Sequence, residues 1–300
     1  MQINASAAYA RGATGKGEVV AVSDTFIVPD HREFNLLDER GERVGSKVIV
    51  VGPQDRSIAG LSAGHGSSVA SLIAGTRDEA AIERNMHGVA FDATLVFRQI
   101  DLRHNPAKVK NMPDDLNLLT EQDDQDLAAR FFNFDYVRAA GAGIINQSFG
   151  PVGHIDLYPE TLVREKLKHV AAALEQKGVP PADKIIVVRS GGNQGDDCFG
   201  ICSMGAPRVN PTSVGLWAGL GVYFPGLRGH VLAVVAVGED GLLADFSNPC
   251  GRAKIFCLAA PGKGLAAANS EAINISFRGT SGSAALVSGS LALLRQYFRD

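Results

Sequence analysis

Four polar residues in this sequence have the types that acyl transfer requires. Ser281 offers a hydroxyl nucleophile, and His65, set between two glycines, offers a base that works near neutral pH. Asp24 could fix the tautomer of the imidazole and stabilise its cation. Asn193 could donate to a tetrahedral oxyanion, together with the backbone N–H of Ser281 at a helix N-terminus. The bare entrance to that helix, "GTSGS", would leave room for a substrate carbonyl.

Each of the four residues also has a simpler explanation. Asp24 could cap a turn at a strand end, and His65 could be a capping or core histidine. Asn193 could occupy a left-handed turn, and Ser281 could belong to an ordinary helix N-cap with its hydroxyl neighbours. Since all four are expected at strand ends or helix starts of one chain, we favour a joint site.

The elements that must position these residues alternate between strands and helices. Buried parallel strands are predicted at "GEVVAVSD", "SKVIVVG", "ATLVFRQI", "GIINQS", "KIIVVRS" and "HVLAVVAVG". Helices are predicted near residues 67–74, 126–140, 159–176 and 281–298. The alternation predicts a three-layer α/β fold with a mostly parallel central sheet flanked by helices. Such sheets carry functional groups at the carboxyl ends of their strands.

Three hundred residues suit one large domain or two small ones, and we expect a single domain spanning residues 1–300. Apolar residues make up 45% of the chain, which is enough for a sizeable core. The net charge of −3 argues against a nucleic-acid partner. No apolar run is long enough to span a bilayer, and no signal peptide is evident. Residues 111–129 form an acidic insert without Lys or Arg, which we expect to be a solvated loop or helix face.

The four cysteines fall in two local pairs, Cys198 with Cys202 and Cys250 with Cys257. Their spacing is wrong for zinc, and no histidine lies near them in sequence. Free core thiols remain an alternative. Two short-range disulfides explain the pairs better and would indicate an oxidising compartment.

The motifs together resemble those of the subtilisin-type serine proteases. The similar segments are "VAVSDT", "GHGSSVASLIAG", "INQSFG", "SGGNQG" and "GTSGSAALVSG", in the order Asp, His, Ser, and the match runs from about Gly15 to Phe298. The start "INASAAYARGATGKG" and the cysteine-bearing segment from Leu227 to Gly262 resemble more narrowly the protease passengers of Gram-negative autotransporters.

The resemblance implies a subtilisin-like fold and a serine endopeptidase acting on proteins or peptides. It assigns Asp24, His65 and Ser281 to the catalytic triad and Asn193 to the oxyanion hole. Ser148, Phe149 and Gly150 match the strand that pairs with substrate, and Ser190, Gly191 and Gly192 match a wall of the pocket before the scissile bond. It further implies secretion or display at the bacterial surface, with a C-terminal membrane translocator in the full-length protein.

Several positions depart from the family pattern. Phe26 replaces a glycine near the triad aspartate, Ser68 a second histidine, and Ala285 a proline in the serine helix. Glu33 matches the position of a family calcium ligand. We expect no cofactor, with calcium binding possible but not supported by the sequence. The 19 residues after Ser281 lead us to expect that C-terminal elements of the fold are lacking. A catalytically decayed domain that serves as a binding or scaffold module is the alternative function.

Overall fold

The computed structural model describes seven segments of the chain: residues 3–59, 64–77, 86–101, 116–151, 153–196, 210–269 and 273–299. Two sequence predictions therefore fall wholly or partly outside it. Cys198 and Cys202, the first predicted cysteine pair, lie outside these segments, and so do residues 111–115 of the predicted acidic insert.

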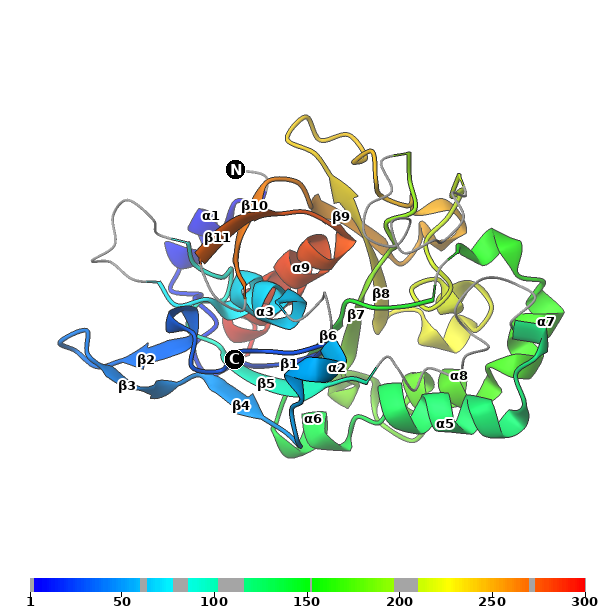
Figure 1. Cartoon of the computed structure of the whole chain (residues 1–300), viewed down its shortest axis with the longest axis horizontal. Helices are drawn as coiled ribbons and strands as arrows, with labels where there is room; N and C mark the ends of the chain where they lie inside the picture. Colours follow the sequence, from blue (N-terminus) through cyan, green and yellow to red (C-terminus); the bar gives the residue numbers. More distant parts are fainter. Residues whose placement is uncertain are drawn as a thin grey trace.

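A parallel seven-stranded sheet forms the centre of the molecule (Figure 1), which confirms the predicted fold class. The strands run in the order β4-β5-β1-β6-β7-β8-β9, and every neighbouring pair is parallel. Their bounds are β1 Val19–Asp24, β4 Val48–Val50, β5 Thr94–Gln99, β6 Ile144–Gln147, β7 Ile186–Ser190, β8 Val231–Val237 and β9 Cys257–Pro261. Two antiparallel pairs lie outside this sheet: β2 Asn35–Leu37 with β3 Arg43–Ser46, and β10 Leu265–Ala268 with β11 Ile273–Phe277.

Helices cover both faces of the sheet, as Figure 1 shows. Helices α3 His65–Ala74 and α9 Thr280–Tyr297 pack together on one face. The other face is covered by α5 Glu121–Phe131, α6 Asp135–Ala139, α7 Glu160–Lys166 and α8 Lys168–Glu175. Two short helices, α1 Ala5–Tyr9 and α2 Arg56–Ala59, complete the α-helices of the described segments. Short 3₁₀ turns include η1 Arg32–Phe34, η5 Ile155–Leu157, η6 Pro181–Asp183, η8 Leu220–Val222, η9 Pro225–Leu227 and η10 Gly251–Ala253.

Alternation along the strands builds two hydrophobic layers. In β1, Val20 and Val22 join the core beneath α3 and α9, whereas Ala21 joins the core beneath α5–α8. In β7, Val188 and Val187 divide in the same way. Successive side chains of a strand point to opposite faces, and here both faces are buried. This is why the strands read as continuous apolar runs rather than as alternating ones.

Two predicted helices are interrupted, and local hydrogen bonds and dihedrals explain the breaks. The helix predicted over 126–140 is divided into α5 and α6, where Asn133 Oδ1 accepts a hydrogen bond from the Asp135 N–H at 2.8 Å. A side chain that satisfies the backbone locally competes with helix continuation. The helix predicted over 159–176 breaks at Leu167, which has non-helical dihedrals and is the N-cap residue of α8.

Asp124 supplies the cap for the N-terminus of α8. Its carboxylate accepts hydrogen bonds from the backbone N–H groups of His169 at 2.7 Å and Val170 at 3.1 Å, and it also contacts His169 Nδ1 at 2.9 Å. Asp124 is only 1% exposed. The expectation of a wholly solvated acidic insert is therefore wrong at this residue, which satisfies otherwise unpaired donors of a helix packed beside it.

Replacement of Asp124 by alanine is expected to lower the free energy of unfolding by about 2–3 kcal/mol, because buried N–H groups at the start of α8 lose a charged acceptor. Urea unfolding followed by circular dichroism measures the change. Asp126→Ala is the matched control, since this exposed carboxylate of α5 bonds only Gln122 among the described residues. It should change stability by less than about 0.5 kcal/mol. Equal stabilities for the two variants would contradict the capping role.

Candidate active site

Asp24 and His65 meet at the carboxyl end of strand β1, in the middle of the sheet. Asp24, the last residue of β1, is 2% exposed, and its Oδ1 lies 2.7 Å from Nδ1 of His65. The same oxygen accepts a hydrogen bond from the Thr25 N–H at 2.7 Å, which fixes the carboxylate. Because an ionised carboxylate only accepts hydrogen bonds, Nδ1 carries the proton and Nε2 is left as the basic nitrogen.

His65 is the first residue of α3, and the backbone at Phe26 passes close to the start of this helix. A Cβ on the next residue, Gly66, would lie 2.3 Å from the carbonyl oxygen of Phe26, so only glycine fits there. Phe26, which replaces the glycine usual in the family, contacts this turn through its backbone, and the Asp24–His65 contact forms in its presence. The ring of Phe277 in β11 packs on the His65 ring, with 5.8 Å between their centroids. The site thus has an apolar side that the sequence motifs did not indicate.

The pKa of His65 is raised above its usual value. Burial acts to lower this pKa, but the charge of Asp24 and the hydrogen bond to it outweigh burial. An imidazole in this setting accepts a proton more readily than one in water, because its cation is stabilised by the neighbouring carboxylate.

Ser281 lies in the first turn of α9 and is 6% exposed. Its carbonyl accepts a hydrogen bond from the Ser148 hydroxyl at 3.4 Å, and this hydroxyl in turn accepts one from Asn146 Nδ2 at 2.9 Å. Within the described segments, no hydrogen bond joins the Ser281 hydroxyl to His65. Such contacts are commonly loose until substrate is bound.

The amide of Asn193 is oriented by Thr280, which precedes Ser281. Its Oδ1 accepts hydrogen bonds from the Thr280 N–H at 2.9 Å and from the Thr280 hydroxyl at 3.0 Å. A backbone N–H can only donate, so the accepting atom must be oxygen and the amide nitrogen points the other way. Asn193 itself thereby satisfies one unpaired donor of the α9 N-terminus.

Two of the simpler explanations from the sequence are therefore wrong. The left-handed turn proposed for Asn193 is absent, since among the described non-glycine residues only Asn4 and Gln176 have positive φ. The N-cap position of α9 is Gly279, which has no side chain to cap with, and its place is taken by the Asn193 amide oxygen.

The two segments assigned to substrate binding follow adjacent strands of the sheet. Ser148–Gly150 comes directly after β6, and Ser190–Gly192 begins with the last residue of β7. The second segment is also tied to α9, because the Gly192 N–H donates to the Thr280 hydroxyl at 3.2 Å. The ends of β1, β6 and β7 and the starts of α3 and α9 thus bring all the predicted polar residues of the described segments to one edge.

Arg189 lies behind the first of these segments, and sequence reasoning missed it. It is fully buried, donates to the Phe149 carbonyl at 3.2 Å and contacts Gln147 Oε1. Its guanidinium carbon lies 5.1 to 5.5 Å from the ring centroids of Phe132, Phe149 and Trp217. Burial lowers the pKa of Arg189 to about 9, so the group remains charged at neutral pH. A charge at the end of an apolar strand, "KIIVVRS", was the available signal.

One of the two predicted disulfides is confirmed. Cys250 is bonded to Cys257, with sulfur atoms 2.01 Å apart. The other predicted bond stays a prediction, because both of its residues, Cys198 and Cys202, lie outside the described part of the chain.

Neither a metal site nor a membrane span is found in the described residues. Among them, no cluster of three or more His, Cys, Asp or Glu side chains is arranged to hold a metal ion. In the same part of the chain, no helix combines the length and apolar character needed to cross a membrane.

Comparison with known proteins agrees with the motifs. A model described as the Subtilase family matches residues 15–300. The extracellular serine protease of Serratia marcescens is 39% identical over 99 residues, which cover 33% of this chain and 9% of the relative. Serotype-specific antigen 1 of Mannheimia haemolytica is 36% identical over 91 residues, covering 28% of this chain and 10% of the relative. The matches therefore span a small fraction of these longer proteins.

Solved structures show the same fold. The protease domain of PatA, solved as a mutant, is 23% identical with a TM-score of 0.61, covering 95% of this chain and 82% of that one. MycP1 from Mycobacterium smegmatis is 22% identical with a TM-score of 0.61, covering 100% of this chain and 73% of that one. The shared architecture, together with the family match, supports a serine protease hydrolase.

Proposed function

The chain belongs to the subtilase family, and on that premise we propose that it is a serine endopeptidase with Asp24, His65 and Ser281 as its triad. The observation that carries the proposal is the 2.7 Å contact between Asp24 Oδ1 and His65 Nδ1. It fixes the tautomer in which Nε2 can take the proton of the Ser281 hydroxyl. Ser281 then attacks the peptide carbonyl, and His65 returns the proton to the leaving amine.

The charge that develops on the carbonyl oxygen needs donors that are already oriented. The Asn193 amide nitrogen is one, since Thr280 holds the other end of the amide. The Ser281 N–H at the start of α9 is the second. The acyl-enzyme formed on Ser281 is hydrolysed by water that His65 activates, so the residues present supply nucleophile, base and oxyanion donors.

The substrate is a protein or peptide that pairs through its backbone with Ser148–Gly150, with Ser190–Gly192 lining the pocket for the preceding side chain. Backbone carbonyls point in alternate directions along an extended segment. The carbonyl of Phe149 accepts a hydrogen bond from Arg189 and therefore points away from the substrate. The backbone groups of Ser148 and Gly150 would then face the substrate. A ladder of this kind accepts many sequences because it reads no side chains.

Export to the medium or cell surface, as an autotransporter-type passenger with a membrane translocator, is the second part of the proposal. The Cys250–Cys257 disulfide fits an oxidising compartment. The Serratia and Mannheimia relatives, named as an extracellular serine protease and a serotype-specific antigen, point the same way. Alkylation of the exported protein without reductant, followed by mass spectrometry, should leave Cys250 and Cys257 unmodified. Alkylated thiols at both would count against export into such a compartment.

Digestion of unfolded casein separates the enzyme from its alternative, a decayed domain kept for binding. We expect internal cleavages, identified by mass spectrometry of the products, that persist in a chelator because the chemistry uses no metal. Products trimmed only from the chain ends would contradict an endopeptidase. Intact casein that co-elutes with folded protein would favour the binding module.

The pH dependence tests the role of His65. Protonated imidazole cannot act as base, so activity falls as pH drops through the folded-state pKa. Since Asp24 raises that pKa, the acid limb of kcat/KM should have its midpoint above about 6.5. Burial lowers the pKa of both His154 and His230, so neither would produce such a limb. Steady-state kinetics from about pH 5 to about pH 9 measure it, and a midpoint below the ordinary histidine value would contradict the assignment.

A further inference from the structure

Asn248 lies against the turn that carries Asn193 and contacts the residues on both sides of it. Its Oδ1 accepts a hydrogen bond from the Gln194 N–H at 2.9 Å. Its own N–H donates to the Gly192 carbonyl at 3.0 Å. Asn248 is fully buried, so water does not compete for these contacts. The residues immediately before and after Asn193 are therefore held by one side chain and its backbone.

The fit between Asn248 and the turn is close. Gly192 has φ +111°, and a Cβ there would lie 2.8 Å from Asn248 Nδ2. The orientation of the amide follows from its partners, because the Gln194 N–H can only donate and the Ser213 carbonyl, 3.2 Å from Nδ2, can only accept. An amide is thus required, rather than a carboxylate or an apolar side chain of the same size.

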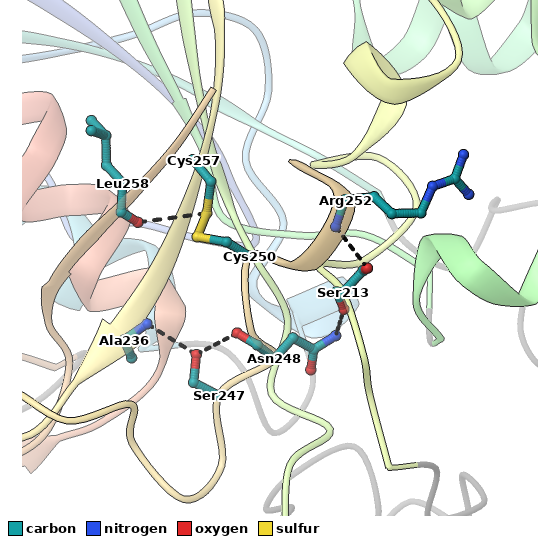
Figure 2. Close-up of a disulfide and its surroundings, with 8 residues drawn as sticks. All are labelled: Ser213, Ala236, Ser247, Asn248, Cys250, Arg252, Cys257 and Leu258. Atoms are coloured by element: carbon teal, nitrogen blue, oxygen red, sulfur yellow. Dashed lines mark hydrogen bonds between the residues drawn. A yellow bond between two sulfur atoms is a disulfide. The ribbon is translucent and has the colours of Figure 1, made fainter. Parts of the chain in front are cut away.

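The chain just beyond Asn248 is anchored to the central sheet by the disulfide (Figure 2). Cys250 is bonded to Cys257, the first residue of β9, which pairs with Ala233 of β8. Between the two cysteines, the Arg252 N–H donates to the Ser213 hydroxyl at 3.1 Å. The loop therefore also binds Ser213, whose carbonyl accepts from the Asn248 amide. Before Asn248, the Ser247 hydroxyl accepts from the Ala236 N–H of β8 at 3.0 Å and donates to the Asn248 carbonyl at 2.9 Å.

We propose that Asn248 is a positioning residue for the oxyanion amide and that the Cys250–Cys257 disulfide holds Asn248 in place. The inference rests on the proposed function, since Asn193 must be the oxyanion donor. Asn248 is fully buried, so we expect it not to touch substrate. It acts through the backbone on both sides of Asn193, and a donor that is held still costs nothing to reorient when charge develops on the carbonyl.

Asn248→Ala is expected to lower kcat by about 10-fold with little change in KM. The substitution loosens the contact between the Asn193 amide and the substrate oxygen, and this contact forms only in the transition state. Turnover is expressed per active site, counted by titration with a fluorophosphonate, so that a smaller folded fraction does not imitate the effect. Asp245→Ala is the control, since the half-exposed carboxylate of this residue in the same loop pairs only with Lys263 within the described part of the chain. It should keep the wild-type kcat.

The decisive comparison repeats Asn248→Ala in an Asn193→Ala background. A positioning role predicts that the second substitution then has almost no further effect on kcat, because the group it positions is gone. A full additional 10-fold loss would assign Asn248 a general structural role and overturn the proposal. If Asn193→Ala alone left kcat unchanged, the oxyanion assignment itself would have failed, which is a separate result.

The disulfide is tested with the double variant Cys250→Ala/Cys257→Ala, because a reductant would act on every disulfide of the protein. Its kcat per titrated site should fall in the same direction as that of Asn248→Ala, and again only when Asn193 is present. Wild-type turnover in the double variant would show that the bond does not hold Asn248.

Discussion

Replacement of Ser281 by alanine is expected to lower kcat by about a millionfold, the size of the loss known for the serine of subtilisin. Without the hydroxyl, no acyl-enzyme forms and His65 has no proton to take. Some rate above that of water alone should remain, because Asn193 and the substrate-binding segments still bind the peptide and polarise its carbonyl. Hydrolysis of a fluorogenic peptide, with KM and kcat measured separately, gives the loss.

Ser290→Ala is the matched control for this experiment. Ser290 lies on the same helix, and in the segments that the structure describes its hydroxyl bonds only the Leu286 carbonyl one turn earlier. Activity should therefore be unchanged. A Ser281→Ala protein that cleaved at the wild-type rate would remove Ser281 from the mechanism.

Replacement of Asn193 by alanine is expected to lower kcat by about 10²–10³-fold, or roughly 2.7–4 kcal/mol, with KM almost unchanged. The amide nitrogen meets the carbonyl oxygen strongly only when negative charge develops, so the ground state loses little. kcat and kcat/KM should fall together, as they do when a transition-state contact is removed.

Alanine also removes the acceptor for the Thr280 N–H, so a second variant is needed to separate structure from chemistry. Asn193→Asp keeps an oxygen toward Thr280 and the helix N-terminus, but it replaces the amide donor with a negatively charged acceptor. We expect this protein to fold with normal stability and to lose at least as much kcat as the alanine variant. Wild-type kcat in Asn193→Asp would show that the amide nitrogen does not stabilise the oxyanion.

Much of the fold was predictable because parallel strands buried on both faces leave an unmistakable apolar signal. Six strands of the sheet and the helices that begin near Ser67 and Ser281 were predicted from sequence. Strand β9 was not, because "CLAAP" is short and rich in alanine, and its edge position exposes Leu258. The two helices on the other face were predicted without their breaks. The break after α5 is local, at Asn133, but the start of α8 is capped by Asp124 from 45 positions away, which no local pattern encodes.

The candidate site shows the same division. Asp24, His65, Asn193 and Ser281 could be identified because their types and their places at strand ends match a known chemistry. The direction of the Asn193 amide could not, since it is set by Thr280 from a segment 87 positions away. Asn248 and Arg189 were missed for a related reason. Their roles come from burial against the turn and the substrate segment. Nothing in the sequence indicates the role of Asn248, and the charge at the end of an apolar strand was the one indication for Arg189.

Labelling with a fluorophosphonate probe tests the assembled triad most directly. The probe reacts only with a hydroxyl whose proton can be removed, and it marks the residue covalently. Peptide mapping of the labelled wild-type protein should place the modification on Ser281, and labelling should be lost in Ser281→Ala and be strongly slowed in His65→Ala. A folded wild-type protein that remained unlabelled, or that was labelled at another serine, would contradict the account.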